Sequence, residues 1–241
     1  LMVAVSVIIG VSIMISSFRF TVVTWLDQVL QGDVYVSAPS GTSTQATTPL
    51  DPDVLPLVES WPGVERVDLL RTVAVESADG PVLVHAVYNP DYGERPFLSD
   101  DLAPDARWAA MEDGAVVVSE PYANRTGLSR EDSTVTLYTQ DGPRDFAVAG
   151  VYYDYVASQG AISMSLDTYR RFWGDDALTA LAIRLAPGVA AEPVARELGD
   201  ALAPTQRLFV RPNQALRQEA LVIFDRTFAI TGALQLLATV V

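Results

Sequence analysis

The stretch LMVAVSVIIGVSIMISS, from Leu1 to Ser17, decides the fold, because it is an uncharged apolar run of almost membrane-spanning length. A second apolar run, FAITGALQLLATVV, covers Phe228 to Val241. Each run is shorter than the roughly 20 residues that a helix needs to cross hydrocarbon. Between them lie roughly 200 residues, enough for one large domain or two small ones. We therefore expect a piece of a longer protein, in which the ends of two membrane helices frame a folded domain.

Both apolar runs are expected to continue as amphipathic stalks. After Arg19, apolar residues recur at helical spacing from Phe20 to Leu30, so the first helix should extend to about residue 30. Pro212-Asn213 marks the start of the second helix, with Asn213 as its cap. One face of the second stalk carries the residues Leu216, Ala220, Ile223, Phe224, Thr227 and Phe228. The competing interpretation is a pair of amphipathic helices inside a soluble core.

Charge beside the two apolar runs leaves the orientation across the membrane open. Arg19 and Arg226 lie on the domain side of the runs, which the positive-inside rule would assign to the cytoplasm. That rule weakens for long translocated domains. The charges of the stalks suit the polar face of helices that leave a bilayer; they are Arg19, Asp27, Arg217, Glu219, Asp225 and Arg226.

Composition excludes several classes of partner and site. Asp and Glu number 30 against 16 basic residues, which gives a net charge of −14. Binding to nucleic acid or to anionic lipid through a basic patch needs clustered positive charge, so neither is expected. All the basic residues are Arg, and the absence of Cys excludes disulfides and thiolate metal sites.

Between the stalks, the hydrophobic pattern predicts an α+β domain of mixed order. Alternating or β-rich segments predict strands at residues 34–36, 64–76, 82–88, 115–119, 134–139, 146–152, 161–164, 179–185 and 208–211. Capping signals and helical spacing predict helices at residues 51–60, 107–112, 120–127, 165–173 and 189–202. Residues 38–50 and 89–104 are rich in turn-forming residues and are expected to form loops.

No catalytic constellation is present in the sequence. His85 is the single His and lies between Val84 and Ala86 in a strand pattern, so it is interpreted as structural or surface. A serine hydrolase would need this His as its base, and the G-x-S-x-G elbow is missing. The absence of Lys excludes Ser–Lys and Schiff-base chemistry. A glycine-rich phosphate loop is missing as well.

Metal and cofactor sites are not expected in this chain. One His and no Cys do not make a zinc site. The acidic pairs lie in loops or at element ends, where solvent surrounds the charge; they are Asp100-Asp101, Glu131-Asp132 and Asp175-Asp176. Tyr152, Tyr153 and Tyr155 surround Asp154 between two strands and form a candidate contact surface. Packing of a strand end is the competing interpretation.

Four stretches of sequence, taken in their order along the chain, resemble a known protein family. They are Gly10 to Arg19 with Trp25-Leu26 and Gly32 to Ser37; Ser119 to Leu128 with Phe146 to Tyr155; Gly160 to Met164 with Tyr169 and Trp173-Gly174; and Phe224 to Thr231. In this order they resemble the extracytoplasmic, MacB-like periplasmic core domain of FtsX-like ABC transporter permeases. The resemblance covers nearly the whole chain, although none of its motifs is catalytic.

The resemblance implies a location and a domain plan. The main domain would lie on the extracytoplasmic side of a bacterial cytoplasmic (inner) membrane. Residues 1–31 would form the end of a transmembrane helix and a stalk, and residues 213–241 a stalk and the start of the next transmembrane helix. Between them, a porter-like βαβ lobe would comprise residues 32–88 plus 178–212, with an inserted mixed β lobe at residues 89–177.

The resemblance also implies partners and a role. ATP and Mg would bind a cytoplasmic ABC ATPase, on a separate subunit or domain, and a second permease copy or paralogue would complete a dimer. Membrane lipid, and an extracytoplasmic partner or a lipophilic or peptide substrate, would be further contacts. This chain would act without catalysis, transmitting ATP-driven conformational change for export, lipoprotein release or envelope remodelling. The coupling residues would be Trp25, Leu26, Val29, Leu30, Leu216, Ile223, Phe224 and Phe228, whose other interpretation is ordinary helix packing.

Two other classes of function remain open at this stage. An extracytoplasmic ligand-sensing domain of a membrane receptor or sensor kinase would also lie between two membrane helices. An exported enzyme would need chemistry that the sequence does not display. Screening for hydrolase activity that is lost on His85→Ala would reveal it.

Overall fold

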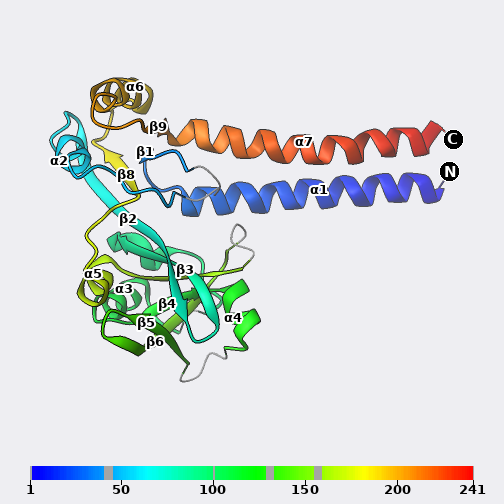
Figure 1. Cartoon of the computed structure of the whole chain (residues 1–241). Helices are drawn as coiled ribbons and strands as arrows, with labels where there is room; N and C mark the ends of the chain where they lie inside the picture. Colours follow the sequence, from blue (N-terminus) through cyan, green and yellow to red (C-terminus); the bar gives the residue numbers. More distant parts are fainter. Residues whose placement is uncertain (1, 41–45, 100, 129–132, 155–158, 241) are drawn as a thin grey trace. The chain divides into compact units, whose positions relative to one another are not determined.

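The computed structural model describes residues 2–40, 46–99, 101–128, 133–154 and 159–240 (Figure 1). The chain divides into two compact units. We call Leu1–Gln31 with Arg211–Val241 the helical unit, and Gly32–Val210 the sheet unit.

The helical unit consists of two long helices that run side by side in opposite directions (Figure 1). Helix α1 spans Met2–Val29 and helix α7 spans Asn213–Val240, each 28 residues or about 42 Å long. The predicted extension of the first helix to about residue 30 and the predicted start of the second at Asn213 are confirmed. Within the described residues, one segment, Ile9–Val29, is long and apolar enough to cross a membrane.

The sheet unit is a mixed α+β fold, as predicted. Its strands are β1 (Val34–Ser37), β2 (Val64–Ser77), β3 (Gly80–Tyr88), β4 (Val116–Ser119), β5 (Thr134–Thr139), β6 (Gly142–Tyr152), β7 (Ala161–Ser165), β8 (Ala180–Leu185) and β9 (Phe209–Pro212). Its helices are α2 (Val54–Glu59), the 3-10 helix η1 (Pro90–Glu94), α3 (Pro104–Glu112), α4 (Glu120–Thr126), α5 (Leu166–Trp173) and α6 (Ala191–Leu202). Helix η1 corrects the prediction of a loop over residues 89–104, and α3 begins at Pro104 rather than at the predicted Arg107.

The strands follow the order β3-β7-β4-β6-β5-β2-β8-β1-β9, and β3 also pairs with β2. The first six strands of this order therefore close on themselves, and we call them the six-stranded ring. We call the first half of β2 together with β8, β1 and β9 the open sheet. The long strand β2 belongs to both, because Val64–Leu70 pairs with β8 and Leu69–Ser77 pairs with β3.

The predicted lobe limits remain a prediction, because all of Gly32–Val210 forms one compact unit. Strand pairing changes inside β2, near Leu70. It does not change after Tyr88, since β3 pairs in parallel with β7 of the predicted inserted lobe. Within this unit, the hydrogen-bond pattern therefore passes from the open sheet to the six-stranded ring in the middle of one strand.

Alternation of apolar side chains explains how the ring is filled and covered. On β3, β4 and β7, one set of alternate side chains joins the main core: Val82, Val84, Ala86, Val116, Val118, Ile162 and Met164. Side chains of the other face pack with η1 and α3 in a second cluster: Val87, Tyr92, Phe97, Trp108, Met111, Val117 and Tyr152. Strand β4 is buried along its whole length because both of its faces are covered.

Helix η1 and helix α3 approach so closely that a glycine is needed at the contact. A Cβ atom added at Gly93 would overlap the carbonyl oxygen of Pro104. We expect Gly93→Ala to lower the free energy of unfolding by about 1–3 kcal/mol or more, because the backbone must move to relieve the overlap. The measurement is urea unfolding of the chain followed by tryptophan fluorescence.

The matched control for this prediction is Gly199→Ala on α6. There the new methyl group would lie 3.7 Å from Val210, an ordinary contact, in a helical position. Alanine is favoured over glycine in a helix by up to about 1 kcal/mol, so this variant should be unchanged or more stable. Equal stabilities of the two variants would contradict the proposed close contact.

Candidate functional site

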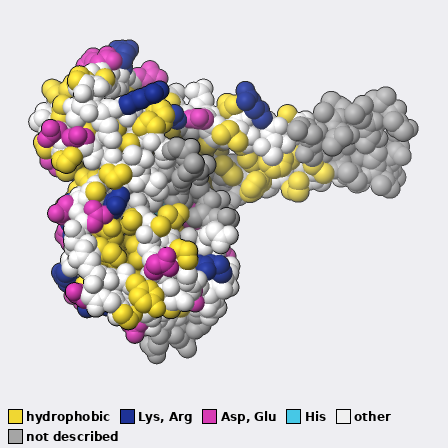
Figure 2. Space-filling view, viewed as in Figure 1, with side chains coloured by type: hydrophobic (Ala, Val, Ile, Leu, Met, Phe, Trp, Pro, Cys, Tyr) yellow, Lys and Arg dark blue, Asp and Glu magenta, His cyan; other side chains and the backbone are white. Residues whose placement is uncertain are grey.

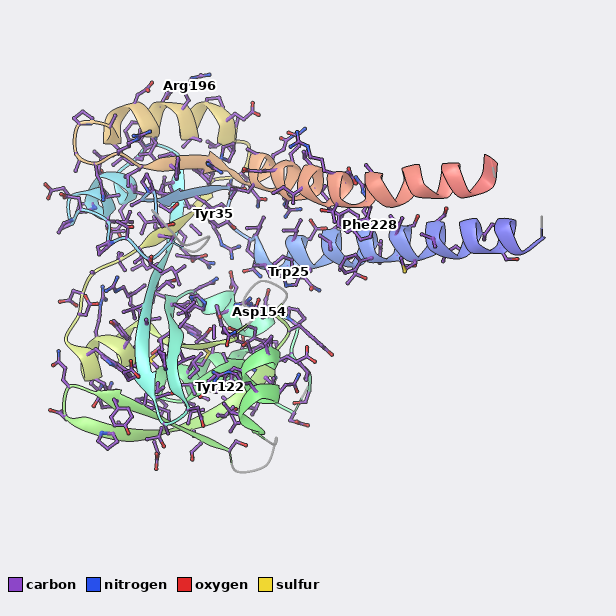
Figure 3. The ribbon with its side chains drawn as sticks, turned by 45° about the vertical axis from the view of Figure 1, so that its right-hand side comes forward. Trp25, Tyr35, Tyr122, Asp154, Arg196 and Phe228 are labelled. Carbon is purple, nitrogen blue, oxygen red and sulfur yellow. The ribbon has the colours of Figure 1, made fainter. Side chains whose placement is uncertain are left out.

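The helical unit is the candidate site, because it contains all the predicted coupling residues. Three phenylalanine rings join its helices: Phe18 of α1 lies 5.5 Å from Phe224 and 6.0 Å from Phe228, centroid to centroid. Phe224 and Phe228 are themselves 4.6 Å apart on successive turns of α7. Figure 3 shows Phe228 on the side of α7 that faces α1. Aromatic pairs at these distances add roughly 0.5–1.5 kcal/mol beyond the burial of their area.

Two ion pairs fix the antiparallel register of α1 and α7. Nε of Arg19 lies 3.1 Å from a carboxylate oxygen of Asp225. Arg217 donates a hydrogen bond to Asp27. The two pairs are equally far apart along each helix, so one alignment forms both of them at once.

Arg217 and Asn213 also bind the last backbone carbonyl of the α1 segment. Nδ2 of Asn213 lies 2.8 Å from the carbonyl oxygen of Leu30, and Nη2 of Arg217 lies 3.3 Å from the same atom. Nε of Arg217 donates to the side-chain oxygen of Asn213 at 2.6 Å. Carbonyls at a helix end lack partners within their own helix, and the end attracts cations. The beginning of α7 therefore caps the end of α1.

The predicted coupling residues differ in how far they are buried. Leu26 and Phe224 are the most enclosed, with an exposed fraction of 8% each. Five others are half-buried: Trp25, Val29, Leu30, Leu216 and Phe228. Ile223 is 62% exposed, so it does not belong to the packed face of α7. The coupling role of these residues remains a prediction.

Exposed apolar side chains lie along the described part of both helices (Figure 2). They include Ile9, Ile13, Met14, Phe20, Val222 and Ile223. An exposed apolar surface of this kind is typical of a helix that contacts lipid or a partner protein.

The predicted tyrosine contact surface needs correction. Tyr152 is only 1% exposed and packs edge-on against Phe97, with ring centroids 6.3 Å apart. It cannot form an exposed contact, because η1 and α3 cover this face of the sheet. Tyr153 is half-buried, and its backbone N–H donates to the carbonyl of Pro96. Tyr155 lies outside the described residues.

A cluster of polar and aromatic side chains surrounds Tyr152 instead. The guanidinium group of Arg95 lies 4.8 Å from the ring centroid of Tyr92 and 4.7 Å from that of Tyr152. Arg95 donates to the hydroxyl of Tyr92, which donates at 2.8 Å to Ser163 of β7. These contacts fasten η1 to the sheet, so the cluster has a structural role.

His85 lies beside this cluster, and its geometry does not suit general-base catalysis. Its Nδ1 atom lies 3.1 Å from the hydroxyl of Thr72. Thr72 is only 1% exposed, so a substrate cannot reach this hydroxyl. Burial, followed by the positive charge of Arg95, lowers the pKa of His85 to about 4. At neutral pH the ring is uncharged.

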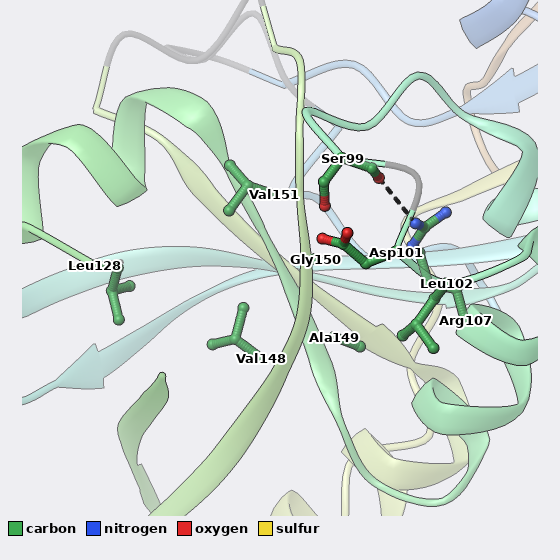
Figure 4. Close-up of a pocket in the computed structure, with 9 residues that line it drawn as sticks. All are labelled: Ser99, Asp101, Leu102, Arg107, Leu128, Val148, Ala149, Gly150 and Val151. Carbon is green, nitrogen blue, oxygen red and sulfur yellow. Dashed lines mark hydrogen bonds between the residues drawn. The ribbon is translucent and has the colours of Figure 1, made fainter. Parts of the chain in front are cut away.

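A small pocket of about 150 Å³ opens beside β6 (Figure 4). Its wall includes Arg107, which donates to the carbonyl of Ser99 at 3.2 Å and lies over the ring of Phe97. Ligand sites are typically about 300–1,000 Å³, so this pocket is too small for most ligands. Within the described residues, no group of three or more His, Cys, Asp or Glu is placed to hold a metal ion.

Comparison with known proteins identifies the family. Residues 1–201 match the MacB-like periplasmic core domain. The chain belongs to this family. Over its whole length, it is 37% identical to a protein of Mycobacterium tuberculosis described as an uncharacterized ABC transporter permease protein. The chain spans 29% of the length of that relative.

The fold of a MacB-like periplasmic core domain is supported by a solved structure. The periplasmic region of MacB from Actinobacillus actinomycetemcomitans matches with a TM-score of 0.56 and 11% identity. The match covers 81% of this chain and 95% of that one. At this identity the likeness shows the fold alone. The predicted family and the predicted α+β fold are therefore confirmed.

The cap formed by Arg217 leads to a testable prediction. Arg217→Ala removes its contacts with Asp27, Leu30 and Asn213, so the last turn of α1 should fray. Hydrogen exchange of the backbone amides at residues 27–31 should then accelerate by about tenfold, the equivalent of one lost hydrogen bond of about 1.4 kcal/mol. Mass spectrometry of the chain in detergent measures this exchange.

Arg226→Ala on the same helix is the control. Arg226 is exposed and, among the described residues, forms no ion pair. Exchange at the end of α1 should be unchanged in this variant. If Arg217→Ala behaves in the same way, Arg217 does not cap α1.

The lowered pKa of His85 predicts a pH-dependent stability. Between pH 6.5, the ordinary pKa of His, and about pH 4, the unfolded chain binds a proton that the folded chain excludes. This contribution to stability is therefore complete above pH 6.5 and is lost as the pH falls toward 4. His85→Gln should flatten the urea-unfolding profile across this range. Parallel profiles for the variant and the original chain would refute this assignment.

Proposed function

We propose that this chain is the extracytoplasmic portion of an ABC transporter permease and that it acts without catalysis of its own. Membership of the MacB-like periplasmic core family and the name of the Mycobacterium tuberculosis relative support the proposal. The main part would lie outside a bacterial cytoplasmic membrane, with α1 and α7 leading into the bilayer. Two lobes, near residues 32–88 with 178–212 and 89–177, remain part of this proposal.

The paired helices would transmit movement across the membrane surface. The observation that carries this proposal is the double ion pairing of Arg19 with Asp225 and Asp27 with Arg217. Sliding one helix along the other by a single residue moves it about 1.5 Å and displaces the partners of both pairs together. Tilting or shifting of both helices as one body breaks neither. Rigid elements with two discrete arrangements are suited to such coupling.

The partners follow from the same proposal. A cytoplasmic ABC ATPase would bind ATP and Mg, and a second permease copy or paralogue would complete a dimer. Lipid would contact the exposed apolar residues of α1, including Ile9 and Ile13. The transported or released molecule could be a lipophilic or peptide substrate, and the role could be export, lipoprotein release or envelope remodelling.

Substitutions in the packed face of the helices test this role. We expect Leu26→Glu and Phe224→Glu to uncouple ATP hydrolysis from transport in the full transporter, because each places a charge in the contact between α1 and α7. The loss of the Phe224 ring contacts alone is comparable to a buried Phe→Ala change, about 3–5 kcal/mol. ATP hydrolysis and transport are measured together in reconstituted vesicles.

Gln218→Glu provides the control, because it adds the same charge at an exposed position of α7. This variant should retain both ATP hydrolysis and transport. Full transport by Leu26→Glu and Phe224→Glu, with normal protein levels, would reject the role of the helix pair.

A further inference from the structure

Four charged side chains of the sheet unit form a closed cluster of alternating sign. Nε of Arg66 lies 2.8 Å from Asp68, and its Nη2 atom lies 2.5 Å from Asp91. Arg184 lies 3.4 Å from Asp68 and 2.8 Å from Asp91. Each cation thus contacts both anions. We call Arg66, Asp68, Asp91 and Arg184 the four-charge cluster.

The strand register explains why two carboxylates are needed. Arg66 of β2 and Arg184 of β8 are direct partners across the antiparallel ladder. Like charges at such positions repel each other. Asp68 lies on β2 beside them and is 5% exposed, so it supplies one negative charge from within the sheet. The second negative charge comes from Asp91, which lies on a different element.

Asp91 brings the other part of the sheet unit to the cluster. It lies in the first turn of η1, where its backbone N–H donates at 3.0 Å to the side chain of Asn89. Helix η1 follows β3 of the six-stranded ring and is fastened to that ring through Tyr92 and Ser163. Arg66 and Arg184, in contrast, lie on paired residues of the open sheet. The cluster therefore bridges the ring and the open sheet.

A second ionic contact lies where the chain passes from the ring to the open sheet. Arg71 of β2 lies 2.7 Å from Asp175, in the connection from α5 to β8. The hydroxyl of Tyr169 donates to the same carboxylate at 2.9 Å, and the backbone N–H of Ala177 donates to its other oxygen. Charged contacts thus join the ring and the open sheet at two places, at η1 and at the connection from α5 to β8.

We propose that the four-charge cluster is a latch that holds the six-stranded ring in one orientation on the open sheet. The ring shares β2 with the open sheet, and a twist of the ring about this strand would separate Asp91 from Arg66 and Arg184. This inference extends the proposed function, because a fixed ring would move with the open sheet when α1 and α7 move. The competing account is that the continuous apolar core fixes the orientation without the charges.

The absence of native Cys makes a distance measurement direct. The spin labels are placed at two exposed positions, Arg196→Cys and Tyr138→Cys. Arg196 lies on α6, which contacts β1 of the open sheet, and Tyr138 lies on β5 of the ring. Electron–electron resonance on the whole chain in detergent reports their distance distribution. The original sequence should give one narrow distribution.

Asp91→Asn is the main variant, because it keeps the size of the side chain and removes its charge. Arg66 and Arg184 then share Asp68 alone, and we expect the distance distribution to broaden by about twofold. Amide exchange in η1 should accelerate by about tenfold, as for loss of a charged hydrogen bond of at least about 1.4 kcal/mol. Asp91→Glu keeps the charge and should retain the narrow distribution.

Asp105→Asn on α3 is the matched control. Asp105 is exposed and, in the part of the chain that the structure describes, forms no ion pair. It should leave the distribution and the exchange of η1 unchanged. An unchanged narrow distribution in Asp91→Asn would overturn the latch and favour the apolar core.

The latch can fail or hold independently of transport. Label distances are measured without an ATPase, and the transport test uses Leu26 and Phe224, which lie in the helical unit. A broadened distribution beside normal transport in Leu26→Glu and Phe224→Glu would support the latch and reject the helix-pair role. A narrow distribution in Asp91→Asn, together with loss of transport in Leu26→Glu and Phe224→Glu, would reject the latch and support the helix-pair role.

Discussion

The antiparallel register of α1 and α7 is the constraint on which the rest of the helical unit depends. It places Arg19 opposite Asp225 and Asp27 opposite Arg217, and it brings the start of α7 to the carbonyl of Leu30, which directly follows α1. Ion pairs that are about half exposed contribute only about 0–1 kcal/mol each. The aromatic contacts therefore supply most of the stabilisation, and the charges select the alignment.

The charges could have predicted this register from the sequence. An Arg is followed eight positions later by an Asp in both stalks, at Arg19 and Asp27 and again at Arg217 and Asp225. When two such segments align in opposite directions, the Arg of each segment lies opposite the Asp of the other. Periodicity within each stalk predicted the helices but not this partner, since the pairing joins residues far apart in the chain. Ile223 shows the same limit, because helical spacing alone could not exclude it from the packed face.

In the sheet unit, local sequence patterns predicted the helices and strands better than they predicted which strands pair with each other. The sequence pattern indicated β3 and β7 as two strands. Their parallel pairing joins residues far apart in the chain, with no tight turn between the strands that could have predicted it. Packing of a strand end, the competing interpretation of the tyrosines, holds for Tyr152, but the sequence did not show that η1 and α3 cover this face. The continuous apolar run of β4 was an available signal, since a strand without alternation is typical of burial on both faces.

The charged contacts between the ring and the open sheet differ in burial from the ion pairs between α1 and α7. Asp68 is almost fully buried, so removing a partner from the four-charge cluster would leave a poorly solvated charge, which is far more costly than losing an exposed pair. Asp91 and the two arginines of the cluster are partly exposed, so Asp68 is the member that depends most on its partners for solvation. If α1 and α7 tilt as one body, the ring and the open sheet would keep their arrangement. A movement that begins in the helices would then reach the ring without being absorbed inside the sheet.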